Sequence, residues 1–132
     1  MGWDAYATKN DEIVNINWNL YNSDKRPELT DPVLKVTFEK AAQTVRELAE
    51  DKYDWMLSFG GLACSDCARM LEKATGIDTH PIDDSLLSSE QVKNLHKKAN
   101  WEFAAIPLWA YWSARKFLEV CAKHNLGMQF SW

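Results

Sequence analysis

Both ends of the chain alternate between apolar and polar positions with a period of two, the pattern of a strand with one buried face. The N-terminal pattern predicts a hairpin of strands 2–8 and 13–19, separated by a polar turn at residues 9–12. The C-terminal pattern predicts a last strand over 128–132, after a helix that ends at Gly127. We expect the last strand to pair with the hairpin, so that both ends of the chain share one small antiparallel sheet.

Between these strands, apolar residues recur every three or four positions, which is typical of helices with one buried face. Asp31 is a favourable N-cap before Pro32, and Ser88 with Gln91 has the form of a capping box. Gly76 is placed to end a helix in the left-handed conformation. Four helices are expected, over about residues 32–51, 63–75, 89–99 and 108–125.

A chain of 132 residues has the size of one domain. We therefore expect residues 1–132 to form a single α+β domain, in which about four helices pack on the small antiparallel sheet. The longest apolar-rich stretch, residues 103–112, is about half of the roughly 20 residues that span a bilayer. The first residues lack the basic and apolar regions of an export signal, and three cysteines are an odd number for a disulfide framework. These features favour a cytoplasmic protein that does not enter a membrane.

The charge balance argues against direct binding to duplex nucleic acid. The chain has 15 Lys and Arg residues against 19 Asp and Glu residues, which gives a net charge of -4. Proteins that bind duplex DNA usually carry a basic patch, because neutralising phosphates supplies much of their affinity. Here the few basic pairs are scattered along the chain.

The segment that contains Cys64-x-x-Cys67 admits several interpretations. Two thiols at the start of a helix can form a redox-active pair, but the expected βαβ context is absent and the intervening aspartate opposes a thiolate. Together with Cys121 and His124, the pair also fits a Cys3His zinc site, and zinc is the one cofactor that the sequence suggests. We favour a third interpretation, in which the cysteines are small buried residues on the core stripe of a helix.

Two polar segments could hold ions. Gly60 and Gly61, placed before a helix, would leave backbone N–H groups for an anion, with Arg69 one to two turns inside that helix. His80 lies in a loop with Asp78, Asp83 and Asp84, a cluster that could bind a cation or place a general base. Acidic loops of this kind are mostly solvated, so a loop without any functional role is the alternative to a cation site or a general base.

A catalytic constellation is not recognisable in the sequence. There is no Ser-His-Asp order, no H-E-x-x-H motif, no P-loop and no G-x-G-x-x-G motif. His96 shares a helical face with Val92 and is expected to be a hydrogen-bonded core residue. We therefore assign no catalytic residue.

Seven tryptophans are the most unusual feature of the composition. Trp109 and Trp112 lie close to Arg115 on the last expected helix, and Trp3 lies in the expected sheet. Aromatic faces next to a guanidinium suit a flat, charged ligand such as a nucleotide. We expect Arg115 to lie at the mouth of a pocket that Trp112 lines. A tryptophan-rich core and a protein interface remain alternatives for the same residues.

Four segments resemble a group of short proteins from bacteria and their phages. These are Met-Gly-Trp-Asp-Ala-Tyr at 1–6, Gly-Gly-Leu-x-Cys-x-x-Cys-Ala at 60–68, Trp-Ala-Tyr-Trp-Ser-Ala at 109–114 and Leu-Gly-Met-Gln-Phe-Ser-Trp at 126–132. The resemblance carries over no activity and no functional residue. Its association with phages implies a host-takeover or counter-defence factor that acts by sequestration more than by catalysis.

We therefore expect a cytosolic binding protein, phage-encoded in the sense of that resemblance, that sequesters a small anionic, nucleotide-like ligand. A protein–protein inhibitor or assembly module that binds a host protein through exposed tryptophans is the alternative, and a metal-dependent enzyme is the third hypothesis. Homo-oligomers are compatible with all three. The residues expected to contact the ligand are Trp3, Gly60, Gly61, Arg69, Trp109, Trp112 and Arg115.

Overall fold

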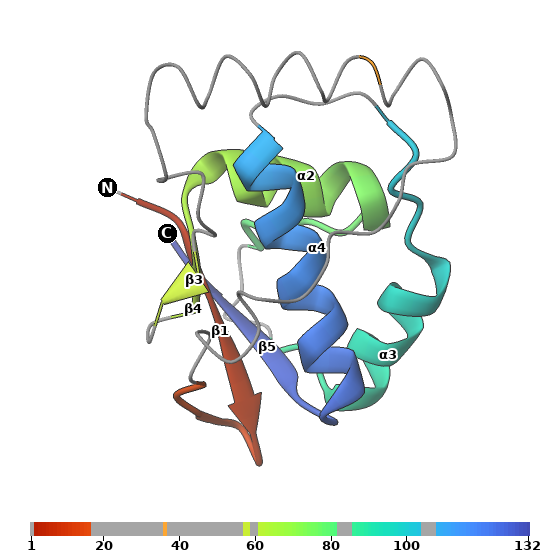
Figure 1. The fold of residues 1–132 in the computed structure, drawn as a ribbon. Coiled ribbons are helices and arrows are strands. Elements are labelled where there is room, and N and C mark those ends of the chain that lie inside the picture. Colours follow the sequence, from red (N-terminus) through yellow and green to blue (C-terminus); the bar gives the residue numbers. More distant parts are fainter. Residues whose placement is uncertain (1, 17–35, 37–56, 59–60, 82–85, 104–107) are drawn as a thin grey trace.

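The sheet is built around the N-terminal strand, because both edges of that strand are paired. β1 (Asp4–Lys9) pairs along one edge with β5 (Gly127–Ser131). Its other edge is shared by β2 (Glu12–Ile13) and β4 (Gly61–Ala63), and β4 pairs in turn with β3 (Leu57–Ser58). All these pairings are antiparallel, and the β1–β5 pair places the two ends of the chain side by side (Figure 1).

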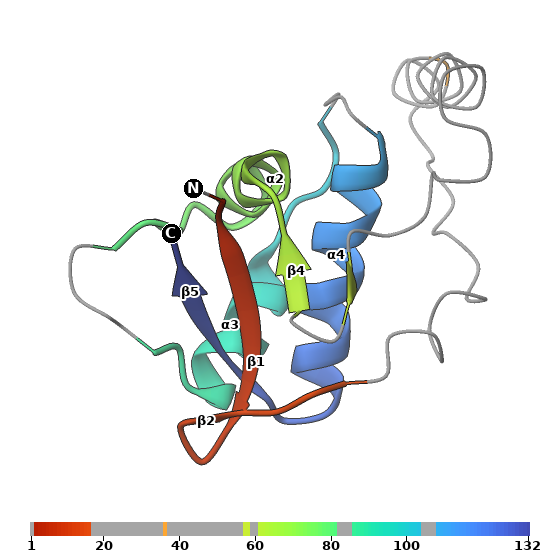
Figure 2. The same ribbon diagram turned by 90° about the vertical axis from the view of Figure 1, so that its left-hand side faces the viewer.

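Helices cover one face of this sheet. The computed structural model describes residues 2–16, 36, 57–58, 61–81, 86–103 and 108–132. Within them, α2 (Ser65–Thr75), α3 (Ser89–Lys98) and α4 (Leu108–Lys123) lie together behind the sheet in the view of Figure 2. The expected α+β class is confirmed. The helix expected over 32–51 lies outside the described residues.

The first and last strands agree with the expected sheet apart from small shifts at their ends, whereas the second strand expected over 13–19 is wrong over residues 14–16, which are not in a strand. β1 spans 4–9 rather than 2–8, and β5 spans 127–131 rather than 128–132. β2 is confined to two residues, although the Val14 N–H still donates to the Ala7 carbonyl at 2.9 Å. Residues 17–19 of the expected second strand lie outside the described residues.

Short sequence signals set the turns and the helix ends. Ser88 and Gln91 form the expected capping box, in which each side chain accepts the other's backbone N–H. Gly76 ends α2 with a φ of 75°, in the left-handed conformation. Asn10 and Asp11, with φ values of 53° and 64°, make the two-residue turn between β1 and β2, which such residues favour.

Gly61 does not open a helix, contrary to expectation. It lies in β4, and α2 begins at Ser65 after the N-cap Cys64. Gly61 has a φ of 104°, and a Cβ built there would lie 2.1 Å from the carbonyl oxygen of Ala5. The glycine is required because β4 approaches the backbone of β1 closely. The sequence pattern did not predict β3 or β4.

The core lies between the sheet and α4, which also packs against both α2 and α3. Because α4 has neighbours on several sides, its buried positions extend around most of the helix, as its nearly continuous apolar first half predicts. Large side chains that are less than 2% exposed form the centre of this core: Tyr111, Phe117, Leu62, Met70, Leu71, Leu118, Met128 and Val92.

Candidate functional site

A groove with a volume of about 540 Å³ lies between α3 and α4; we call it the α3–α4 groove. Its volume falls in the range of about 300–1,000 Å³ that is typical of small-molecule sites. On α3, positions 90, 93, 94 and 97 recur every three or four residues and therefore share one face. The groove is lined by Glu90, Lys93, Asn94, His96, Lys97, Glu119, Ala122 and Lys123.

Each of the two carboxylates in the α3–α4 groove has a lysine partner. Glu90 Oε1 lies 3.6 Å from Lys93 Nζ, one helical turn away on α3. Glu119 Oε2 lies 3.8 Å from Lys116 Nζ on α4. Pairs at this spacing contribute only a few tenths of a kcal/mol, about 0.2–0.5, in exposed positions, but they do neutralise the two carboxylates locally.

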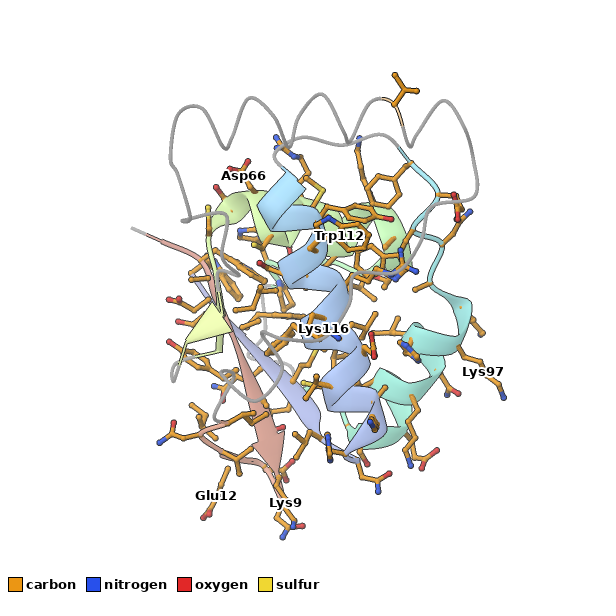
Figure 3. The ribbon with its side chains drawn as sticks, viewed as in Figure 1. Lys9, Glu12, Asp66, Lys97, Trp112 and Lys116 are labelled. Atoms are coloured by element: carbon orange, nitrogen blue, oxygen red, sulfur yellow. The ribbon has the colours of Figure 1, made fainter. Side chains whose placement is uncertain are left out.

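Two further lysines of the groove are not neutralised in this way. Within the part of the chain that the structure describes, neither Lys97 nor Lys123 has a carboxylate at ion-pair distance. Lys97 is one of the lining residues of the groove, and its side chain extends from α3 into the solvent on the side away from α4 (Figure 3). Its side chain has four rotatable bonds, so its ammonium group can reach over the rim toward a bound ligand. The groove can therefore offer two positive charges to an anion.

His96 lies on the exposed side of α3 and lines the groove, so the expectation that it is a core histidine is wrong. The buried face of α3 is narrower than its periodicity suggests. Val92 is the one residue of α3 that is fully buried, whereas Leu95 and Ala99 are only partly buried against the core. His96 adds a ring nitrogen to a groove that the sequence pattern did not reveal.

Trp3 is a core residue rather than an exposed stacking platform. Its side chain is 2% exposed and stacks on Phe130, with ring centroids 5.7 Å apart. The indole Nε1 donates to the backbone carbonyl of Thr79 at 2.9 Å. A ligand could stack on this ring only by displacing these contacts.

Arg115, Tyr111 and Trp112 share one flank of α4, as expected from their spacing, but this flank is packed. Trp112 is 6% exposed, and the Arg115 guanidinium carbon lies 5.7 Å from the centre of its ring. Arg115 also donates to the Tyr111 hydroxyl at 3.1 Å, and that hydroxyl donates to the Trp101 carbonyl at 2.5 Å. Burial raises the pKa of the Tyr111 phenol, and the charge of Arg115 opposes part of this shift. The tyrosine therefore stays a hydrogen-bond donor.

The packing of Arg115 predicts a structural effect for its substitution. Arg115→Ala should lower the free energy of unfolding by about 1–3 kcal/mol, because it removes a charge-assisted hydrogen bond and cation–π contacts. Urea denaturation would measure this loss. Arg115→Lys should restore only part of it, since an ammonium lacks the planar fork of the guanidinium. Unchanged stability combined with weaker binding of a nucleotide would instead support the expected pocket mouth.

The remaining residues expected to bind a ligand do not complete a site. Arg69 is exposed on α2 and pairs with Asp66 at 2.8 Å, one turn earlier. Gly60 and the side chain of Trp109 lie outside the described residues, and Gly61 has the strand role given above. Of the seven expected ligand residues, none that the structure describes lines the α3–α4 groove.

The cysteines are not gathered into a zinc site. Cys67 and Cys121 are fully buried, and burial raises the pKa of both thiols, that of Cys121 to about 12. Both therefore stay protonated at neutral pH. Among the described residues, the ligand atoms of Cys64, Cys67, Cys121 and His124 do not converge within 4.8 Å of one another. Cys64 is partly buried at the start of α2, with its Sγ 3.9 Å from Asp66 Oδ2.

Exposed aromatic surface is limited in the described part of the chain. Trp3, Trp101 and Trp112 are buried, whereas Trp132 is 44% exposed at the end of the sheet. No described helix is both long enough and apolar enough to cross a membrane. No protein-family model, curated protein or solved structure matches this chain.

Proposed function

We propose that the protein binds and sequesters a small anionic ligand with the size and charge of a nucleotide, and that the α3–α4 groove is its site. The observation that carries this proposal is the pair of lysines, Lys97 and Lys123, that border a groove of about 540 Å³ with no carboxylate partner among the described residues. A phosphate group would supply the missing negative charge. Sequestration of such a ligand is the role that the resemblance to phage proteins favours.

Several groups of the groove suit different parts of such a ligand. The ammonium groups of Lys97 and Lys123 would contact phosphate oxygens, and the Asn94 amide can both donate and accept hydrogen bonds. Ala122 provides a small apolar surface, and the His96 ring can stack or donate at the rim. No group in this set is a nucleophile activated by a neighbouring base, which favours binding over catalysis.

The helix dipoles oppose an anion at this position, which limits the expected affinity. Lys97 and Lys123 lie in the last turns of α3 and α4, where each dipole carries roughly half a negative charge. The two lysines also compensate that partial charge in the free protein. A bound phosphate must therefore contact both ammonium groups at once to outweigh the partial negative charge of the helix ends. We expect a dissociation constant in the micromolar range, which corresponds to a binding free energy of about -8 kcal/mol.

The test is the affinity for ATP, measured by isothermal titration calorimetry with lysine variants. Lys97→Ala and Lys123→Ala should each weaken binding by about 5–30-fold, the loss of one charge-assisted contact of about 1–2 kcal/mol. Lys98→Ala is the matched control, since Lys98 is exposed at the same end of α3 but does not line the groove. Equal effects of Lys97→Ala and Lys98→Ala would contradict the proposal. So would an unchanged affinity when Lys97 and Lys123 are both replaced by alanine.

A further inference from the structure

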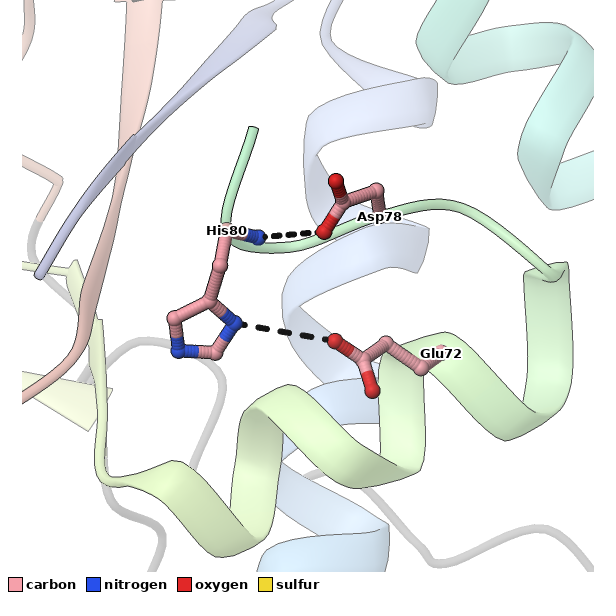
Figure 4. A group of neighbouring side chains, drawn as sticks. All are labelled: Glu72, Asp78 and His80. Atoms are coloured by element: carbon pink, nitrogen blue, oxygen red, sulfur yellow. Dashed lines mark hydrogen bonds and ion pairs between the residues drawn. The ribbon is translucent and has the colours of Figure 1, made fainter. Parts of the chain in front are cut away.

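A second polar site lies beside the C-terminal half of α2 and shares no residue with the α3–α4 groove. Glu72, Asp78 and His80 each offer one metal-ligand atom, and these atoms all lie within 4.8 Å of one another. Figure 4 shows the His80 ring turned toward the Glu72 carboxylate, with Asp78 above them. We call these residues the Glu72–Asp78–His80 cluster, and we propose that it binds a divalent first-row transition metal ion, with Zn²⁺ as the best fit.

The chain reversal after α2 creates the cluster. Glu72 lies in the last turns of α2, and Gly76 ends the helix in the left-handed conformation. Residues 78–80 then run back beside α2, which brings Asp78 and His80 to Glu72 (Figure 4). Three ligands from a helix and the segment after it thus meet without any long-range rearrangement of the chain.

A buried residue fixes the backbone of this segment. Thr79 is fully buried, its carbonyl accepts the Trp3 indole N–H, and its hydroxyl donates to the Glu72 carboxylate. The His80 N–H donates to Asp78 Oδ1 at 2.9 Å. The positions from which all three ligands project are therefore held by the core, although the side chains of Glu72 and His80 remain 42% and 43% exposed.

The imidazole of His80 lies beside two tryptophan rings. Its centroid lies 6.4 Å from that of Trp3 and 5.7 Å from that of Trp132, which meets it edge-on. His80 Nδ1 lies 3.7 Å from Glu72 Oε1 and 3.1 Å from the Thr79 hydroxyl. These ring contacts and the imidazole itself distinguish the cluster from an exposed group of acidic residues, because His80 packs on aromatic side chains with Nδ1 facing the Glu72 carboxylate.

The ligand chemistry selects the class of metal. Two carboxylates alone would suit Mg²⁺ or Ca²⁺, but an imidazole shifts the preference to first-row transition ions such as Zn²⁺. Ligand atoms about 2.1 Å from a tetrahedral metal lie roughly 3.4 Å apart. His80 Nδ1 and Glu72 Oε1, 3.7 Å apart, are already close to this spacing, and no pair of ligand atoms is more than 4.8 Å apart. Within the described part of the chain, Glu72 Oε2 and Asp78 Oδ2 accept no hydrogen bond. Each carboxylate can therefore bind the ion through one oxygen, while its second oxygen keeps the hydrogen bond that it accepts from Thr79 or from the His80 N–H.

The test is Zn²⁺ binding by isothermal titration calorimetry in a Cys64→Ser background, which removes the partly buried thiol that would also bind Zn²⁺. We expect one equivalent to bind, and His80→Ala or Glu72→Gln to weaken its affinity by at least tenfold. His96→Ala and His124→Ala are matched controls, because they replace the other two of the three histidines in the chain. Both controls should retain the affinity of the background protein.

A second readout locates the ion without relying on variants. Paramagnetic Ni²⁺ should broaden the backbone amide signals of residues 72–80 and 130–132 before any others in ¹H–¹⁵N spectra. Broadening centred on His124 or on residues 64–67, or equal affinities of His80→Ala and the background protein, would overturn the proposal. So would the absence of Zn²⁺ binding at millimolar concentration. None of these outcomes bears on nucleotide binding in the α3–α4 groove, which the lysine variants test separately.

Discussion

Gly61→Ala is expected to cost more than about 3 kcal/mol of the free energy of unfolding, a large part of the total of about 5–15 kcal/mol of an ordinary domain. The new Cβ would lie 2.1 Å from the Ala5 carbonyl oxygen and 3.3 Å from the Tyr6 Cα. These are backbone atoms of β1, which cannot move aside because β5 pairs along its other edge. The positive φ of Gly61 adds about 1–2 kcal/mol for any residue with a Cβ.

The matched control is Gly76→Ala at the end of α2. Gly76 also has a positive φ, 75°, but nothing lies within 4 Å of a Cβ built there. Its substitution should cost only about 1 kcal/mol, the penalty of the left-handed conformation. Urea denaturation followed by tryptophan fluorescence compares the two variants. Similar midpoints would show that β4 does not approach β1 as closely as described.

Trp3→Ala should have the second large effect, a loss of about 3–5 kcal/mol of the free energy of unfolding. The substitution leaves a cavity beneath the sheet, removes the stacking on Phe130 and leaves the Thr79 carbonyl without its indole donor. Trp3→Phe partly separates these contributions, because it keeps an aromatic ring against Phe130 but removes the N–H together with part of the indole volume. We expect about 1–3 kcal/mol for that variant.

The same two Trp3 variants distinguish core packing from ligand stacking. If Trp3 is a core residue, both variants lose stability, and any folded protein binds ATP in the α3–α4 groove with unchanged affinity. If Trp3→Ala keeps its denaturation midpoint and loses ATP binding instead, the tryptophan is a stacking platform, as the sequence alone allowed.

The parts of the fold that the sequence predicted depend on local signals. The alternation around Ala5 and Ala7, the capping box at Ser88 and Gln91, and the helix end at Gly76 are each contained within a few residues. β3 and β4 were missed because strands of two and three residues are too short to show a period. The prediction that Gly61 opens a helix is wrong because the residue that it contacts, Ala5 of β1, is distant in the sequence.

The candidate sites were harder to predict because they depend on how elements meet. In the sequence, Lys97 and Lys123 belong to two separate polar helix faces, and only the packing of α3 against α4 brings both lysines to one groove. The spacing of Arg115 and Trp112 was interpreted correctly as a shared flank, but Trp101, from the segment before α4, helps to bury it. His80 was noticed in the sequence, whereas Glu72 joins it only through the chain reversal at Gly76.

Chemical-shift mapping with ATP tests the proposed groove most directly. A titration of the ¹⁵N-labelled protein, followed by ¹H–¹⁵N correlation spectra, reports on every backbone amide without substituting any residue. We predict that saturable shifts concentrate on residues 90–97 and 119–123, which line the α3–α4 groove, with inorganic phosphate causing weaker shifts at the same positions. Saturable shifts that centre on Trp112 and Arg115, or no saturable shift up to millimolar ATP, would contradict it.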